Sequence, residues 1–192
     1  VEDLNIEEDG FITTVSPLFG HNFGAVIRWG INNTLAIETG LNYTRRNFDL
    51  EANLDDTITG SSQFGVVTYE IPIQGLFYVR LSKEWYMNAA TGFSMTFRST
   101  DVGAFTENRE FSTTTRVKGL NLGYVANLGF EYRSKKKGTF YLGASLSTPF
   151  VSLGAIAIQS ESISNPRLIT GKLNGNYLAF DLRYFFNENK KK

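Results

Sequence analysis

Much of this chain alternates between apolar and polar residues, which is the two-residue period of a β-strand whose faces meet different surroundings. Residues 69–81 and 85–97 show the pattern best, and the short segment 82–84 joins them as a turn. Cross-strand partners must share a face. With that turn one face is apolar throughout: Leu81 pairs with Trp85, Val79 with Met87, Phe77 with Ala89, Ile73 with Phe93, Ile71 with Met95 and Tyr69 with Phe97. The other face is small or polar, so the pattern predicts a long antiparallel hairpin.

The same pattern recurs along the chain. The predicted strands are residues 11–18, 19–29, 35–48, 69–81, 85–97, 117–133, 139–151 and 176–186. Their connections alternate between short turns and long polar loops, the loops being residues 49–63, 99–115 and 159–175. Short turns on one side and longer loops on the other are typical of an outer-membrane barrel. We therefore predict an all-β fold, a transmembrane antiparallel up-and-down β-barrel of eight strands with short periplasmic turns and longer extracellular loops.

Two further hairpins have specific expected registers. Around the turn at residues 30–34, the expected pairs are Trp29 with Leu35, Ile27 with Ile37 and Phe23 with Leu41. Around the turn at residues 134–138, they are Tyr132 with Phe140, Phe130 with Leu142, Leu128 with Ala144 and Tyr124 with Thr148. A slip of one residue would move every side chain to the wrong face.

The first strand is the least regular. A closed bacterial barrel has an even number of strands, so residues 11–18 are assigned as the first strand, with a tight turn near residues 19–21. The alternative is a first strand upstream of Val1. Because Val1 is not a methionine, we expect a mature, exported chain from which a signal peptide has been removed. The expected division is an irregular N-terminal segment (1–10), the outer-membrane barrel (11–186) and a polar C-terminal tail (187–192).

Aromatic residues cluster at two levels of the apolar face. Six lie near the turn ends of their strands, namely Trp29, Trp85, Tyr132, Phe140, Tyr184 and Phe186. Six more lie about a strand length away on the same face, namely Phe23, Tyr43, Tyr69, Phe97, Tyr124 and Phe150. Two aromatic girdles around an aliphatic band are typical of a membrane-spanning barrel. The alternative is a soluble barrel that buries this face as its core, which would not need the girdles.

Composition narrows the function classes. The 192-residue chain has 19 basic and 19 acidic residues, so no strong field favours nucleic acid as a partner. It contains no cysteine, which excludes disulfides, thiolate chemistry and cysteine-ligated metals. No apolar run approaches the roughly 20 residues of a membrane-spanning helix. The mean hydropathy of −0.18 is compatible with a membrane barrel, because lumen and loop residues dilute the lipid-facing ones.

Charged residues on the small or polar face point into the predicted lumen. They are Arg28, Glu38, Glu70, Arg80, Arg98, Glu131, Arg133, Asp181 and Arg183. Eight strands enclose only enough room for side chains, and isolated charges are costly to bury, so we expect these charges to pair and plug the barrel. The alternative is a gated ion or solute path, since inward glycines leave space for water: Gly24, Gly40, Gly92, Gly123, Gly129 and Gly143. Pro72, also inward, predicts a bulge or a local break, because proline lacks a ladder donor.

Residues with catalytic or metal-binding chemistry are few. His21, the only histidine, points outward at the rim, with no serine one or two positions away on its strand. A catalytic base must face its nucleophile, so a rim histidine without function is favoured over a lipid-modifying site. The acidic residues Asp49, Glu51, Asp55 and Asp56 offer oxygen ligands for calcium, but their spacing matches no EF-hand, and a solvated loop is favoured. We predict no catalytic residue, no metal site and no cofactor.

Three segments resemble the PorT-like outer-membrane β-barrel family of Bacteroidetes. They are residues 36–43, the Glu-Ile-Pro element within residues 69–73, and the aromatic ending at residues 178–186. The resemblance spans roughly residues 19–186. It implies an eight-stranded outer-membrane barrel without assigned catalytic residues. One member, PorT, is associated with the type IX secretion system, which implies a role within a larger envelope complex.

The sequence thus predicts a non-enzymatic outer-membrane barrel that is an accessory or scaffolding subunit of a larger envelope complex for secretion, assembly or transport. A narrow ion or small-solute channel is the alternative, and a lipid-modifying barrel enzyme is less favoured. The expected partners are outer-membrane lipid and lipopolysaccharide, an envelope protein complex and the outer-membrane assembly machinery. That machinery is expected to read the C-terminal signal Tyr184, Phe185 and Phe186 through strand addition.

Overall fold

The chain folds almost entirely into β-strands. The computed structural model describes residues 4–8, 11–54, 57–98, 102–105, 111–116, 119–134, 136–160 and 168–187. The strands are β1 (Leu4–Glu8), β2 (Phe11–Gly30), β3 (Leu35–Leu54), β4 (Thr57–Arg80), β5 (Trp85–Arg98), β6 (Val102–Phe105), β7 (Phe111–Arg116), β8 (Leu120–Ser134), β9 (Gly138–Pro149), β10 (Gly154–Ser160), β11 (Leu168–Leu173) and β12 (Tyr177–Phe185). None of the residues that the structure describes forms a helix long and apolar enough to cross a membrane.

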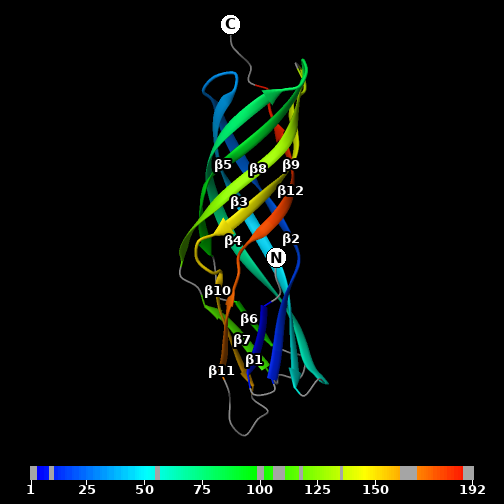
Figure 1. The fold of residues 1–192 in the computed structure, drawn as a ribbon, viewed down its shortest axis with the longest axis vertical. Helices are drawn as coiled ribbons and strands as arrows, with labels where there is room; N and C mark the ends of the chain where they lie inside the picture. The colour runs from blue at the N-terminus through cyan, green and yellow to red at the C-terminus, as the bar shows by residue number, and fades with distance from the viewer. Residues whose placement is uncertain are drawn as a thin grey trace.

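Tilted antiparallel strands curl into a nearly closed barrel (Figure 1). The main sheet has the order β1-β2-β3-β4-β5-β8-β9-β12, and a second sheet has the order β11-β10-β7-β6. In Figure 1 the second sheet and β1 lie at the end of the molecule away from the C-terminus. We call this the loop end, and the opposite end, with the three short turns, the turn end. The architecture confirms the predicted all-β antiparallel barrel.

Two of the three predicted hairpin registers are confirmed. In the β4–β5 hairpin Ile73 pairs with Phe93, and in the β8–β9 hairpin Tyr132 pairs with Phe140. The positive φ of +87° at Gly138 completes the second of these turns, a conformation that glycine adopts without strain.

The predicted register of the β2–β3 hairpin is wrong by two residues. Trp29 pairs with Ile37 rather than with Leu35. The side-chain carbonyl of Asn32 accepts hydrogen bonds from the backbone N–H groups of Thr34 and Leu35, both at 2.8 Å. Asparagine favours such a local ring in turns, and with it the β2–β3 pair nearest the turn is Gly30 with Ala36. A shift of two residues keeps every side chain on its predicted face.

The expected start of the barrel is also wrong. Residues 11–18 and 19–29 belong to one strand, β2, and no tight turn separates them. A bulge between Leu18 and His21 interrupts the β2–β3 register instead. The bulge changes which alternate residues face inward, and this change of parity made one strand resemble two. The segment 1–10 is not wholly irregular, because Leu4–Glu8 forms β1 and pairs with the beginning of β2.

The three polar loops prove to contain strands. β3 and β4 extend through most of residues 49–63, and residues 99–115 and 159–175 contain β6, β7, β11 and the end of β10. Toward the loop end, the inward residues of β2, β3 and β4 are apolar and at most 6% exposed: Val15, Phe48, Leu50, Phe64 and Val66. The opposite face of β3 carries Asn47, Asp49 and Glu51. The pattern is that of a water-exposed β-structure with an apolar core, so the strands continue beyond the apolar wall as a folded extension.

Pro72 interrupts the sheet without shifting it. The β3–β4 pairs stop at Thr39 with Ile73 and resume in the same register at Asn42 with Glu70. The hydroxyl of Thr39 donates a hydrogen bond of 2.6 Å to the carbonyl of Pro72 and thereby satisfies an acceptor at the break. Of the two predicted alternatives, the local break is correct and the bulge is not.

The candidate functional site: a charged lumen inside an apolar wall

The lumen is organised around two carboxylates that are almost completely buried. Glu38 on β3 is 2% exposed and Glu131 on β8 is 0% exposed. The guanidinium of Arg28 on β2 lies between them, with Nη2 at 2.7 Å from Glu38 Oε2 and Nη1 donating to Glu131 Oε1. Alternation places all three residues on the inward faces of their strands, where a buried charge depends on its partner.

Further charges extend this core in both directions. Arg183 on β12 contacts Glu38 at 2.7 Å and Asp181 at 3.0 Å, while Arg133 contacts Glu131 at 2.9 Å. The amide of Asn88 on β5 donates a 2.6 Å hydrogen bond to Glu131. We call the resulting chain of ion pairs the lumen network; its order is Asp181, Arg183, Glu38, Arg28, Glu131, Arg133. Three acids alternate with three arginines, so the network is neutral.

Aromatic rings pack against the arginines of the lumen network. The guanidinium carbon of Arg28 lies 4.0 Å from the centre of the Phe185 ring, and that of Arg133 lies 4.0 Å from the centre of the Tyr86 ring. Arg183 lies 4.9 Å from the ring centre of Tyr141. Cation–π contacts of this kind stabilise arginine where water is scarce. Phe185 therefore faces the lumen, whereas the neighbouring Tyr184 and Phe186 face outward.

A second buried ion pair lies nearer the loop end. Arg46 Nη2 contacts Glu70 Oε1 at 2.7 Å, and the hydroxyl of Tyr177 donates a 2.7 Å hydrogen bond to Glu70 Oε2. The Arg46 guanidinium also lies 4.7 Å from the Tyr177 ring centre. Arg46 was missing from the predicted lumen charges, although it has the same inward parity on β3 as Glu38. That parity is the signal that would have found it.

Besides Glu70, which pairs with Arg46, two predicted lumen charges lie outside the lumen network. Arg80 is exposed beside the 82–84 turn, where its Nε donates a 2.9 Å hydrogen bond to the carbonyl of Ser82. Its expected lumen position is therefore wrong, because a long side chain at a strand end reaches water instead of following strand parity. Arg98 is half-buried at the end of β5, where it pairs with Thr68. The ion pairs of the lumen network do not include it.

The lumen is also filled at two glycines that were expected to leave space. Tyr141, 1% exposed, lays its ring over Gly129 and Gly143. A Cβ atom at Gly143 would lie 2.2 Å from the Tyr141 hydroxyl, and one at Gly129 would lie 2.5 Å from the ring. These glycines are needed for close approach of the ring to the backbone, so the space belongs to Tyr141 and not to a water path.

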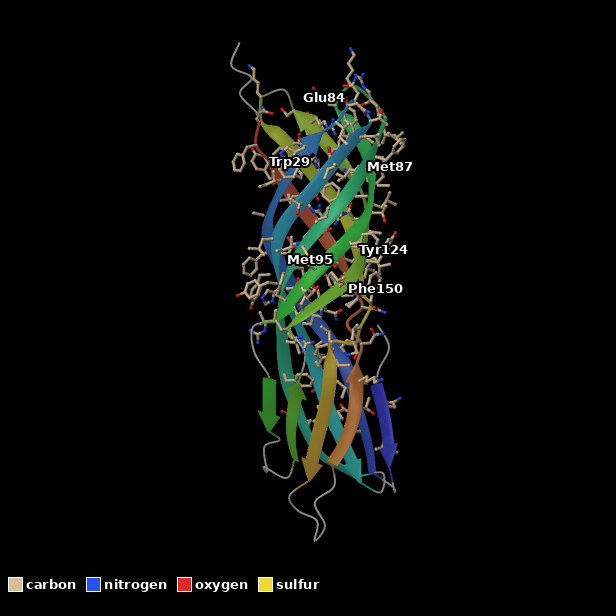
Figure 2. The ribbon with its side chains drawn as sticks, turned by 90° about the vertical axis from the view of Figure 1, so that its left-hand side faces the viewer. Trp29, Glu84, Met87, Met95, Tyr124 and Phe150 are labelled. Carbon is tan, nitrogen blue, oxygen red and sulfur yellow. The ribbon has the colours of Figure 1, made fainter. Side chains whose placement is uncertain are left out.

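The outer wall carries the aromatic residues at the two expected levels. Figure 2 shows Trp29 near the turn end and Tyr124 and Phe150 at the second level. Ring pairs join neighbouring strands at both levels, with centroids 5.2 Å apart for Trp85 and Tyr132 and 4.6 Å apart for Phe23 and Tyr43. The remaining predicted girdle residues also face outward: Tyr69, Phe97, Phe140, Tyr184 and Phe186. Rings at two levels of an apolar wall match the two interfaces of a membrane.

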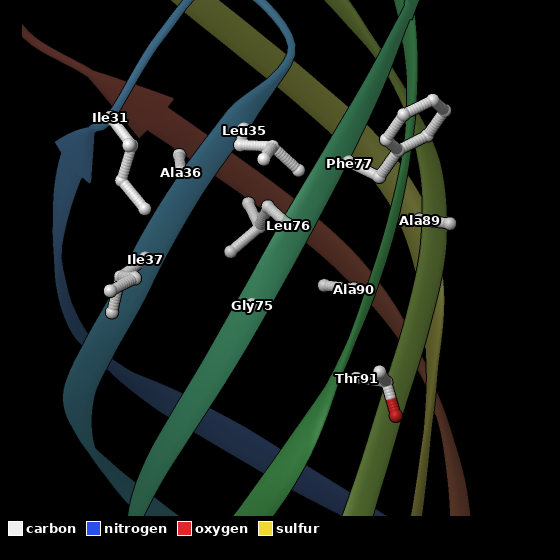
Figure 3. A pocket seen from close by; sticks show the side chains of 10 residues that line it. All are labelled: Ile31, Leu35, Ala36, Ile37, Gly75, Leu76, Phe77, Ala89, Ala90 and Thr91. Atoms are coloured by element: carbon white, nitrogen blue, oxygen red, sulfur yellow. The ribbon is translucent and has the colours of Figure 1, made fainter.

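The wall contains an apolar hollow near the turn end (Figure 3). Gly75 on β4 lies between its strand partners Ile37 and Thr91, and it exposes backbone where a side chain would otherwise stand. The hollow has a volume of about 370 Å³ and is rimmed by Leu35 and Phe77. Its lining is apolar apart from the hydroxyl of Thr91.

Groups suited to catalysis or metal binding are not gathered in the part of the chain that the structure describes. Within that part, no three histidine, aspartate or glutamate side chains lie close enough to hold a metal ion. His21 is exposed on the outer face, with its ring centre 6.4 Å from that of Phe23 and 6.1 Å from that of Tyr43. Two residues of the acidic loop that was expected to be solvated, Asp55 and Asp56, lie outside the described residues.

Most of the chain matches a known protein family. Residues 2–153 match the family described as "Outer membrane protein beta-barrel domain". The chain belongs to this family. The match favours the outer-membrane barrel over the soluble barrel that the alternation left open. No curated protein matches the chain.

Proposed function

We propose that this outer-membrane barrel is a non-conducting, non-enzymatic accessory or scaffolding subunit of a larger envelope complex. The observation that carries the proposal is the lumen network, in which three acids and three arginines neutralise one another inside the barrel. A lumen closed by paired charges provides a rigid wall and not a route. Function then resides on the outer surfaces, where a partner can bind.

The packing around the lumen network argues against a solute path. Leu76 and Tyr78 project into the lumen from β4 and are at most 7% exposed. Tyr141 fills the space over Gly129 and Gly143. An ion crossing the barrel would have to displace these side chains and break salt bridges that hold buried charges, which costs several kcal/mol for each broken pair.

Two lines of evidence support a binding role over catalysis. His21, the only histidine, stacks on the rings of Phe23 and Tyr43 on the outer wall, on the face opposite the charged lumen residues. The resemblance of residues 69–73 and 178–186 to the PorT-like family adds the association with a secretion complex. The lipid-facing wall is proposed to contact outer-membrane lipid and lipopolysaccharide, and Tyr184 and Phe186 to be read by the assembly machinery during insertion.

The test combines purification from native membranes with electrical recording. The tagged protein is extracted in mild detergent, and co-purifying proteins are quantified by mass spectrometry against an untagged strain. We expect a stoichiometric envelope partner, and no conductance steps when the purified protein is inserted into planar bilayers. A lone monomer that opens discrete conductance steps would overturn the proposal in favour of a channel.

A further inference from the structure

The wall of the barrel has an open seam between β2 and β12. β12 pairs with β9 on one side, and β2 pairs with β3. On the other side of β2, the pairs among the described residues join Phe11–Val15 to β1. In the part of the chain that the structure describes, no strand is hydrogen-bonded to residues 16–30 along this edge of β2 or to the free edge of β12.

Side-chain exposure marks the same seam. Phe180 and Leu182 on β12 are 86% and 81% exposed, more than outward residues of the paired strands, such as Phe130 at 48%. The inward residues of β12 are only half-buried, and Asn22 and Gly24 on β2 are exposed. The inward carboxylates of β3, β4 and β8 are buried. The lumen is thus most open along these two strands.

An open edge of this kind is not stable inside a membrane. Hydrocarbon offers no hydrogen-bond partner, so each unpaired backbone N–H or C=O group costs several kcal/mol, and membrane-spanning sheets close for this reason. The free edge of β2 between Phe23 and Trp29, and that of β12, lie between the two aromatic levels and therefore face lipid. A further strand must satisfy them.

The directions of the edges determine how that strand runs. Six antiparallel pairings lead from β2 through β3, β4, β5, β8 and β9 to β12. After an even number of reversals β12 runs in the same direction as β2, so direct closure would require a parallel pair. One strand inserted antiparallel to both edges restores the alternation. A second copy in the same membrane orientation cannot supply it, because its own edges run in the same direction as these.

β1 already has the required direction and position. It runs antiparallel to β2 on the free edge of β2, and its first pair joins Leu4 to Val15. An extension of β1 from Leu4 toward its amino-terminal side, in the same register, would run along residues 16–30 of β2 and enter the seam. We propose that the closing strand is supplied in cis, by the part of the polypeptide that enters β1 from its amino-terminal side.

The seam defines the chemistry of the closing strand. About 9–11 residues span a membrane as a tilted strand. Its outward residues must be apolar, because they lie beside Phe23 and Phe180 in lipid. Its inward residues must be small or polar, because they lie beside Gly24 and Asp181. The closed wall would then bury the exposed end of the lumen network. This inference does not depend on the accessory role proposed above.

Site-specific photo-cross-linking tests the proposal. A benzophenone amino acid replaces Phe180 in the full gene product in its native outer membrane, and cross-linked peptides are identified by mass spectrometry. The expected adduct is intramolecular and joins Phe180 to a peptide on the amino-terminal side of Leu4. The control places the same amino acid at Phe93, whose neighbours are Ile73 and Tyr124, and should yield no such adduct.

Three outcomes would overturn the proposal: an adduct with another protein, an adduct directly with β2, or an adduct with lipid alone. Amide hydrogen exchange gives a second readout that needs no substitution. With the seam filled, successive amides from Leu178 to Leu182 are all protected. With the seam open, protection alternates along β12, because only every second amide bonds to β9. A failed search for an envelope partner would leave both results unaffected.

Discussion

Removing the charge of Glu131 tests whether the lumen network stabilises the barrel. Glu131 is 0% exposed. Its Oε1 accepts hydrogen bonds from Arg28 and Asn88, and its Oε2 accepts two from Arg133, at 2.9 and 3.0 Å. In Glu131→Gln the carbonyl oxygen of the new amide still accepts hydrogen bonds from Arg28 and Asn88. The NH₂ group of the amide then faces the guanidinium of Arg133, and neither group can accept a hydrogen bond from the other. The substitution therefore leaves one arginine without its acid.

The magnitude follows from these contacts. Two charge-assisted hydrogen bonds of roughly 1.5–3 kcal/mol each are lost, and breaking a buried pair by removing one partner costs about 3–5 kcal/mol. The Arg133 side chain is 34% exposed, so water compensates for part of the loss. We expect Glu131→Gln to lower the free energy of unfolding by about 3 kcal/mol, near the bottom of that range.

The assay is a urea titration of the protein in phospholipid vesicles. Fluorescence of Trp29 and Trp85 and heat-modifiable gel mobility report the folded barrel. The control is Arg80→Gln, since Arg80 is an exposed charge beside a turn and should change stability by less than about 0.5 kcal/mol. In a double-mutant cycle, adding Arg133→Gln should recover about 1 kcal/mol or more, because no unpaired charge remains. Equal stability of Glu131→Gln and wild type, or equal losses in Glu131→Gln and Arg80→Gln, would refute this reasoning.

Two other pairs of variants test the packing and the wall. Gly143→Ala places a methyl group 2.2 Å from the Tyr141 hydroxyl and should destabilise the barrel by about 1–3 kcal/mol. At Gly75 an added Cβ would have no atom within 4 Å, so Gly75→Ala should leave the free energy of unfolding unchanged in the same urea titration. Equal losses of stability in Gly143→Ala and Gly75→Ala would contradict the close fit of Tyr141. Leu41→Arg, on the outward face between the aromatic levels, should be unfavourable in vesicle-insertion equilibria, by less than the roughly 2–4 kcal/mol of the bilayer midplane and by more than the roughly 0–1 kcal/mol of its interface. Glu51→Arg, on the same face of β3 in the extension, should change them by less than about 0.5 kcal/mol, and a similar loss in both variants would place the membrane elsewhere.

Strand parity predicted the parts of the structure that depend on a regular period of two. It placed Arg28, Glu38 and Glu131 together inside the barrel and set the β4–β5 and β8–β9 registers. Parity says only which face a residue occupies, however. It did not reveal that Arg80 leaves the lumen at the end of its strand, nor which acid each arginine meets.

The errors arose where a local feature replaced the period. The side chain of Asn32 changed one turn and shifted a register by two residues. The bulge between Leu18 and His21 reversed the parity of β2 and made a single strand resemble two. In and beside the predicted loop 49–63, polar outward residues obscured the alternation of the inward apolar residues Leu50, Phe64 and Val66. In the extension the polar face is outside, the reverse of the membrane region, so a single rule for both regions fails.

Cysteine scanning along the outward face of β3 tests the central claim most directly, that an apolar wall spans the membrane and ends at the level of Tyr43. The native chain has no cysteine, so each substitution introduces a single reporter for a membrane-impermeant maleimide. Cysteines replacing Ile37, Thr39 and Leu41 should be protected in vesicles, and those replacing Asn47, Asp49 and Glu51 should be labelled. Detergent solubilisation should expose the protected positions. Equal labelling on both sides of Tyr43 in intact vesicles would contradict the account.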